Sequence, residues 1–254
     1  MLGLLGALAL AWAFHVYARV LPSAALAALW GVFACLIAAA LFRQARVRRG
    51  AFLAVYFAAA SPLQSWLRGG VFMALGSLAV GGILALVLMT SLARIEGPWQ
   101  WLALLAAVPA IVLLRASLWR PLARHASPHH MAVLSWRVAA LVTGAALVAG
   151  FVLLALHQAY PAFADVSLER AVWHMIDQEQ ARSAPWQGLL EARAGLDGLR
   201  LWLAQQLMPA PGDSFLQMLG WVLVFAEETL FVWSYLLMGY GVLQGIGAHD
   251  RAWY

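Results

Sequence analysis

The sequence predicts an all-α fold: a polytopic helix bundle integral to a membrane, built as one domain over residues 1–254. Three observations support this prediction. Hydrophobic residues make up 64% of the chain and charged residues only 11%, whereas average soluble domains carry roughly 25% charged residues. The apolar residues form long runs of about the 20 residues that cross a bilayer. Most of the charged residues fall between these runs.

Six apolar segments have the length of a transmembrane helix, and we expect each to cross the bilayer: 2–20, 22–42, 71–93, 99–119, 137–160 and 215–243. A further apolar segment, 51–67, is short and contains Pro62, which breaks helices. We interpret 51–67 as a re-entrant or interfacial helix on the cytoplasmic side. A short, tilted span is the alternative.

Arginine placement gives the predicted orientation, because cytoplasmic loops of membrane proteins carry an excess of basic residues. All sixteen basic residues are arginine, and six of them lie in the predicted loops 43–50 and 120–136. The two spans between these segments form one excursion across the membrane and back. We therefore expect both segments and both termini to be cytoplasmic and 161–213 to be external. Because arginine-only, alanine- and leucine-rich composition is typical of GC-rich bacteria, we expect the bacterial inner membrane.

The external segment 161–213 is predicted to contain two amphipathic helices. In SLERAVWHMIDQEQAR, residues 167–182, apolar residues recur at helical spacing and Ser167 is a plausible N-cap. In GLRLWLAQQLMP, residues 198–209, an apolar stripe precedes the proline. We expect the pair to lie on the outer membrane surface or to cap the bundle.

Two adjacent acids, Glu227 and Glu228, fall near the middle of the last predicted span. A charge at that depth costs about 2.5–3.5 kcal/mol, so an acid there needs a polar neighbour. One hypothesis is a proton- or cation-linked carboxylate in a transport path. The alternative is a hydrogen-bonded acid that holds helices or subunits together.

Helical spacing separates the two acids, since consecutive residues point about 100° apart. Glu227 shares a stripe with Ser234 and Gly241, a small and polar face suited to close packing inside the bundle. We expect Glu227 to face the bundle and Glu228 to face a second protein or a lateral opening. Arg115, within the fourth predicted span, is the candidate cationic partner of Glu227.

Motifs typical of enzymes do not occur: there is no P-loop and no G-x-S-x-G, H-E-x-x-H or C-x-x-C. We therefore expect no catalytic set, cofactor or metal site, and we interpret RHASPHH, residues 124–130, as a basic loop. EETLFVW, residues 227–233, resembles the paired glutamates of CAAX-type intramembrane proteases. That family also requires a downstream arginine and later histidine motifs, and this predicted span is the last, so we reject the match.

The threading of the whole chain resembles that of ABC-2-type export permeases, although the chain lacks their usual amphipathic helix ahead of the first span. The main hypothesis is an inner-membrane subunit of a transport system, with Glu227, Glu228, Arg115 and Ser234 lining or supporting a polar path. The alternatives are a non-catalytic anchor or assembly subunit of an envelope complex, and an ABC-2-like permease working with a separate ATPase. We expect the lipid bilayer and protein subunits docking at 43–50 and 120–136 as partners, and no nucleic acid, because the arginines are dispersed.

Overall fold

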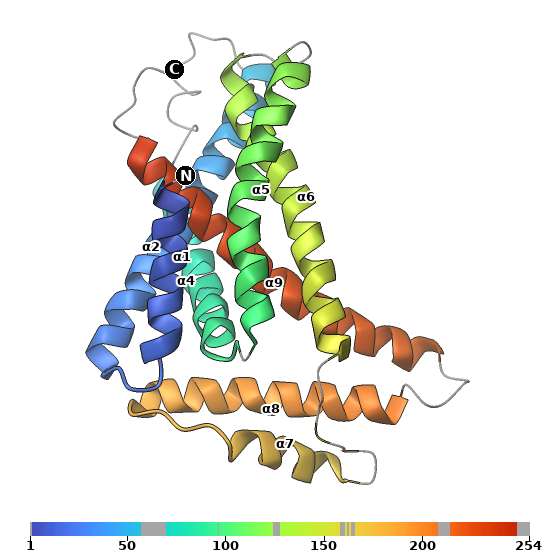
Figure 1. Cartoon of the computed structure of the whole chain (residues 1–254). Coiled ribbons are helices and arrows are strands. Elements are labelled where there is room, and N and C mark those ends of the chain that lie inside the picture. Colours follow the sequence, from blue (N-terminus) through green and yellow to red (C-terminus); the bar gives the residue numbers. More distant parts are fainter. Residues whose placement is uncertain are drawn as a thin grey trace.

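The computed structural model describes residues 2–56, 70–95, 97–123, 128–157, 161, 163, 166–207 and 214–247. The regular structure in these ranges is helical, in eight elements: α1 (Leu2–Tyr17), α2 (Ser23–Tyr56), α4 (Val71–Ala93), α5 (Pro98–Ala123), α6 (Pro128–His157), α7 (Leu168–Ile176), α8 (Ala184–Leu207) and α9 (Ser214–Gly247). Figure 1 shows a bundle of α1, α2, α4, α5 and α6 that α9 crosses obliquely. Helices α7 and α8 lie across one end of this bundle, which we call the α8 end.

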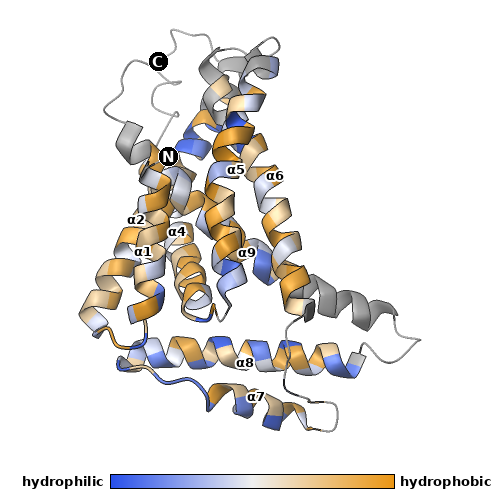
Figure 2. Cartoon of the chain, in the orientation of Figure 1, coloured by the Kyte–Doolittle hydropathy of each residue, from blue (hydrophilic) through white to orange (hydrophobic). Residues whose placement is uncertain are grey.

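Four helical stretches among the described residues are long and apolar enough to cross a membrane: Ser23–Gly50, Val71–Ala93, Pro98–Trp119 and Leu134–Ala155. Figure 2 shows that hydrophobic residues predominate along these helices, as expected of helices in lipid. The chain is therefore a membrane-type helix bundle. Four of the six predicted spans are represented by these stretches, whereas α1 is a shorter apolar helix and α9 is not among the four.

Helix α2 is longer than the sequence predicted. Its 34 residues include 43–50, expected to be a loop, and the first six residues of 51–67. The prediction of a loop at 43–50 was wrong because charge ends a membrane span without ending a helix, and arginine is a good helix former. The rest of 51–67 lies outside the described residues.

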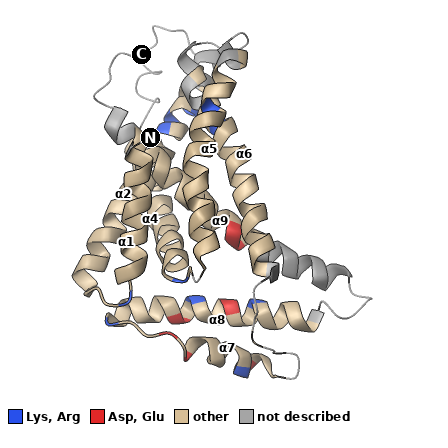
Figure 3. Ribbon diagram, in the orientation of Figure 1, with Lys and Arg blue, Asp and Glu red and all other residues tan. Residues whose placement is uncertain are grey.

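The other predicted loop, 120–136, is also largely helical. Helix α5 continues to Ala123, and α6 begins at Pro128, ahead of the span start expected at 137. Residues 124–127 lie outside the described part of the chain. Helices α5 and α6, which are in contact, extend to the end of the bundle opposite α8 (Figure 1), which we call the basic end. Figure 3 shows described arginines in blue at the basic end.

Close approach between helices depends on two glycines. A Cβ atom at Gly81 of α4 would lie 2.9 Å from the carbonyl oxygen of Ala34 in α2. At Gly241 of α9, a Cβ atom would overlap the carbonyl oxygen of Leu36 in α2. Small residues at these positions let the backbones touch, which is how membrane helices gain packing energy.

Substituting Gly241 by alanine should therefore destabilise the protein by about 1–3 kcal/mol, the usual cost of overpacking. Gly150 of α6 is the matched control, because a Cβ atom there meets nothing within 4 Å. Gly150→Ala should leave stability unchanged or raise it by up to about 1 kcal/mol through helix propensity. Thermal unfolding of both variants in detergent measures the difference. Equal effects would contradict the close α2–α9 contact.

The α7–α8 pair also packs through a glycine. A Cβ atom at Gly198 of α8 would lie 2.9 Å from the Cα atom of Val172 in α7. Helix α7 follows the N-cap Ser167, whose hydroxyl accepts a hydrogen bond from the backbone NH of Arg170 at 3.4 Å. Helix α8 begins at Ala184, well before the start that the sequence suggested at 198.

Candidate functional site

Helix α8 directs its charged residues at the bundle. Arg193, Asp197 and Arg200 are spaced by four and three residues, which places them on one helix face. Their side chains are largely buried, whereas Leu189 and Leu196 on another face are 38% and 59% exposed. This arrangement is the reverse of an ordinary surface helix, which faces water with its charges. The inward charges must therefore find partners in the bundle.

Glu227 of α9 is the partner of both α8 arginines. Arg200 Nη1 donates to Glu227 Oε2 at 2.5 Å, and Arg193 Nη2 forms an ion pair with Glu227 Oε1. The three side chains are each 20% exposed or less. Charge-assisted hydrogen bonds of this kind are roughly twice as strong as neutral ones. Glu227 is thus neutralised by α8, and this contact joins α8 to α9.

The ion pairs continue towards α4 and α1. Arg94, which caps the C-terminus of α4, reaches Asp197 Oδ2 through Nη2 at 3.2 Å and Glu179 Oε1 through Nη1 at 2.5 Å. Arg19, which follows α1, lies 3.4 Å from Glu179 Oε2. We call the seven residues the ion-pair network: Arg19, Arg94, Glu179, Arg193, Asp197, Arg200 and Glu227. It connects α1, α4, α8, α9 and the segment between α7 and α8.

Burial affects the central arginine of this network. Removal from water lowers the pKa of Arg193 from its ordinary value, and the neighbouring Asp197 opposes that shift. A guanidinium is basic enough to stay charged in spite of this shift in its pKa. Its Nε atom is buried and has no hydrogen-bond partner among the described residues. Arg193 therefore retains an unused donor.

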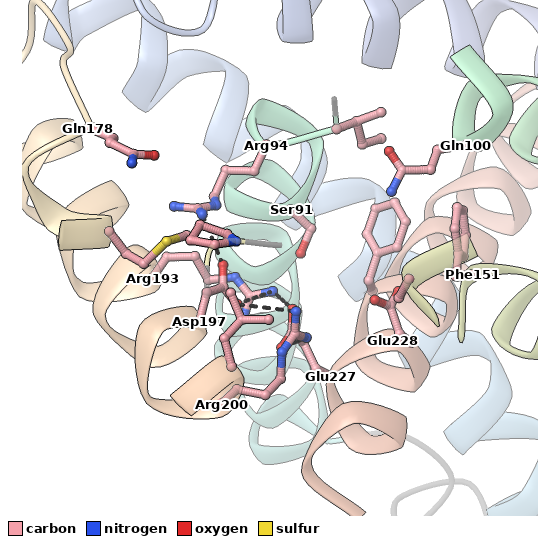
Figure 4. Close-up of a pocket in the computed structure, with 16 residues that line it drawn as sticks. Ser91, Arg94, Gln100, Phe151, Gln178, Arg193, Asp197, Arg200, Glu227 and Glu228 are labelled. Atoms are coloured by element: carbon pink, nitrogen blue, oxygen red, sulfur yellow. Dashed lines mark hydrogen bonds and ion pairs between the residues drawn. The ribbon is translucent and has the colours of Figure 1, made fainter. Parts of the chain in front are cut away.

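A cavity of about 300 Å³ lies beside the network, between α8 and the bundle (Figure 4). This volume is at the lower end of small-molecule sites. Its polar lining comprises three arginines, three acids and three neutral side chains: Arg94, Arg193, Arg200, Asp197, Glu227, Glu228, Ser91, Gln100 and Gln178. The aromatic rings of Phe151 and Phe231 also line it. Cationic, anionic and aromatic groups thus meet in one space.

Glu228 differs from Glu227 because it makes no hydrogen bond or ion pair with another described residue, although Arg193 and Arg200 influence it electrostatically. Figure 4 shows it beside Phe151, away from the dashed ion pairs. The rings of Phe151 and Phe231 are 5.6 Å apart. A carboxylate next to aromatic faces can hold an organic cation.

The cavity also offers unused hydrogen-bonding atoms. Besides Arg193 Nε, the hydroxyl oxygen of Ser91 is buried without a partner among the described residues. Buried polar groups are nearly always paired, so such atoms are candidates for contact with a ligand. Both can donate to an acceptor, whereas Glu228 accepts. The cavity is therefore suited chemically to a small cation or to a zwitterion.

The sequence-predicted site residues fall in three places. Glu227 and Glu228 line the cavity at the α8 end. Ser234 is fully buried two turns further along α9, and its hydroxyl donates to the Leu230 carbonyl at 2.7 Å. Arg115 lines a different cavity with Leu243 of α9, 16 residues or about 24 Å along the helix from Glu227.

The expected pairing of Arg115 with Glu227 is therefore not found, since the cations at Glu227 come from α8. Sequence reasoning missed Arg94, Glu179, Arg193, Asp197 and Arg200. The four- and three-residue spacing of the α8 charges was the available signal. In comparisons with known proteins, the chain matches no family model, no curated protein and no solved structure.

Proposed function

We propose that the chain is an integral membrane subunit of a transport system that binds a small organic cation or zwitterion in the cavity at the α8 end. The observation that carries this proposal is the difference in ion pairing between Glu227 and Glu228. Glu227 is neutralised by Arg193 and Arg200, while Glu228 lines the cavity without an ion pair, beside two aromatic rings. Glu228 is thus the ligand-facing acid, and Glu227 holds the wall of the site.

The packing beyond the cavity supports transport over simple surface binding. Phe231, one turn from Glu227, is buried, and the next turn is closed by Tyr235, whose hydroxyl donates to the Leu104 carbonyl at 3.2 Å. A solute at Glu228 is therefore separated from the basic end by the apolar core. Sites that are closed on one side and reached from the other are the arrangement that alternating access requires.

The proposed orientation follows from charge. The segments 43–50 and 120–136, which adjoin the basic end, hold six arginines, and the sequence has no acidic residue before Glu96 and none from 97 to 164. By the positive-inside rule this end is cytoplasmic, and α7 and α8 are external. In this proposal α1 and α9 also cross, which makes six spans with both termini inside a bacterial inner membrane.

The partner subunits of such a system would dock at the basic end, on the helical residues 43–50 and around 120–136. An ABC-2-like permease with a separate ATPase is one form of this proposal. The cavity has no nucleotide-binding loop, so the energy for transport comes from an ion gradient or from that second subunit.

Choline, a small quaternary ammonium, is the probe for this site. We expect choline to raise the unfolding temperature of the purified chain in phosphatidylcholine nanodiscs, and Glu228→Gln to weaken its binding about tenfold, the value of one hydrogen-bonded charge. Glu169→Gln, an exposed acid of α7, is the control. Glycine betaine tests a zwitterion and acetate an anion. Choline uptake into proteoliposomes then tests transport.

Two outcomes would contradict this assignment. If neither choline nor glycine betaine stabilises the chain, the cavity is not a site for a cation or zwitterion of this size. If Glu228→Gln binds choline as well as the control does, Glu228 is not the ligand-facing acid. Binding without uptake would remove the transport step and leave a membrane-embedded binding protein.

A second candidate, an anchor or assembly subunit, is favoured by one observation. Leu189 and Leu196 of α8 and Trp173 of α7 are exposed apolar side chains on the elements outside the bundle. Such residues mark contacts with protein or membrane. A photo-crosslinking residue at Leu196 in intact cells distinguishes the two: a protein adduct supports assembly, and lipid adducts alone argue against it.

A further inference from the structure

A second cavity lies at the basic end, away from the ion-pair network. Its volume is about 320 Å³, and it is formed by residues of α5, α6 and α9: Ile111, Val112, Arg115, Ala116, Trp119, Trp136 and Leu243. All but one of these side chains are apolar or aromatic. We call this cavity the Arg115 groove. The question is what its single charged residue binds.

Arg115 has no counterion in the described part of the chain, where it makes no ion pair or side-chain hydrogen bond. The sequences of α5 and α6 contain no aspartate or glutamate at all. The side chain is neither fully exposed nor buried. Withdrawing a charge partly from water is costly unless an opposite charge compensates it. An anion that enters the groove would therefore meet a guanidinium that has no counterion among the described residues.

The position of Arg115 fits the headgroup region of a bilayer. It lies four residues, or about 6 Å, before Trp119, where the apolar stretch Pro98–Trp119 ends. Trp119 is 40% exposed, and tryptophan is enriched at the membrane–water boundary. An arginine one turn inside this boundary extends its guanidinium towards the phosphates.

The groove opens on the surface of the bundle that is apolar. Val112, one of its lining residues, is exposed, as is the neighbouring Leu113 of α5. A water-soluble anion would meet one guanidinium and otherwise only hydrocarbon. A phospholipid matches both parts, because its phosphate can pair with Arg115 while its first methylene groups contact Ile111, Val112 and Leu243.

We propose that the Arg115 groove binds the phosphate of an anionic phospholipid from the leaflet at the basic end. The surrounding charge favours an anionic headgroup over a neutral one, since arginines in 43–50 and 120–136 are not balanced by acids in these segments. This site is independent of the cavity at the α8 end. It makes the packing of α5, α6 and α9 dependent on lipid.

The test is native mass spectrometry of the purified full chain with three probes: phosphatidylglycerol, diacylglycerol with the same acyl chains, and inorganic phosphate. We expect phosphatidylglycerol to be retained in preference to diacylglycerol. Arg115→Gln should lower its affinity about fivefold, which corresponds to about 1 kcal/mol for one arginine near a membrane surface. Arg115→Lys keeps the charge and should retain most of the binding.

Arg48→Gln is the matched control, because it removes one exposed arginine from the same end without touching the groove. Equal losses in Arg115→Gln and Arg48→Gln would overturn the proposal and leave a general electrostatic attraction. Equal retention of diacylglycerol would show that the phosphate is not recognised. Displacement of the lipid by an equal concentration of inorganic phosphate would make the site one for a free anion. Circular dichroism confirms that each variant is folded.

Discussion

Replacing Glu227 by glutamine should lower the free energy of unfolding by about 3 kcal/mol, the cost of breaking a largely buried ion pair by removing one partner. The substitution leaves Arg193 and Arg200 facing each other beside Asp197, which must then neutralise both. Their side chains are less than a fifth exposed, so water compensates little. Chemical unfolding of the purified chain in detergent micelles measures the loss.

The neighbouring acid provides the control. Glu228→Gln changes the same chemical group one residue away, where no ion pair is broken, and should cost less than about 1 kcal/mol. A double variant, Glu227→Gln with Arg200→Gln, should lose less than the sum of the two single variants, because the two side chains act as one unit. If Glu227→Gln and Glu228→Gln cost the same, the Arg193–Glu227–Arg200 contact does not stabilise the protein.

Replacing Arg94 by alanine should cost a similar amount, about 3–5 kcal/mol, because two buried carboxylates lose their common partner. Arg94 joins Glu179 and Asp197, whose side chains are only 6% and 10% exposed. The loss falls on the junction between the bundle and the α7–α8 pair. Hydrogen exchange should therefore accelerate in α7 and α8 well before it does in the core of α4.

Arg170→Ala is the control for this variant, since Arg170 is an exposed arginine of α7 outside the ion-pair network. It should leave the exchange rates of α8 within experimental error. Uniform acceleration across all helices in Arg94→Ala would contradict the assignment of Arg94 to the junction.

The apolar runs predicted the bundle because length and hydropathy alone define a membrane span. The predicted segment 71–93 coincides with α4, Val71–Ala93. The predicted helix ends were wrong where they had been placed at charged residues. Arginines ended the predicted span at 42, yet a helix passes from lipid into water without a break, and α2 continues to Tyr56.

The start of α8 was also missed. The prediction rested on the apolar stripe of residues 198–209, whereas α8 begins at Ala184 and includes Gly188, Gly195 and Gly198. In the structure, a Cβ atom at Gly198 would lie 2.9 Å from the Cα atom of Val172 in α7, while one at Gly195 would make ordinary contacts with Ile176 and Val172. Their role is close packing between two helices, and single-sequence propensity carries no information about such a partner.

The candidate site was predictable only in part. The two acids of α9 stand out because carboxylates are rare in apolar runs. The cationic partners of Glu227 could not be recognised in the same way. Arg193 and Arg200 lie in α8, and only the tertiary fold brings α8 against α9. Counting residues placed Glu227 at mid-span, whereas its ion pairs join it to Arg193 and Arg200 of α8, a helix that lies across one end of the bundle (Figure 1).

The oblique course of α9 has a mechanical consequence. It contacts α1, α2, α4, α6 and α8, so it links helices of the bundle to one another and to α8. Two contacts hold α9 in this position: Glu227 with the arginines of α8, and Gly241 with the backbone of α2. While both contacts are intact, α9 resists the sliding of the bundle helices past one another. Loss of the Glu227 ion pairs alone would allow α9 to rotate about its contact at Gly241.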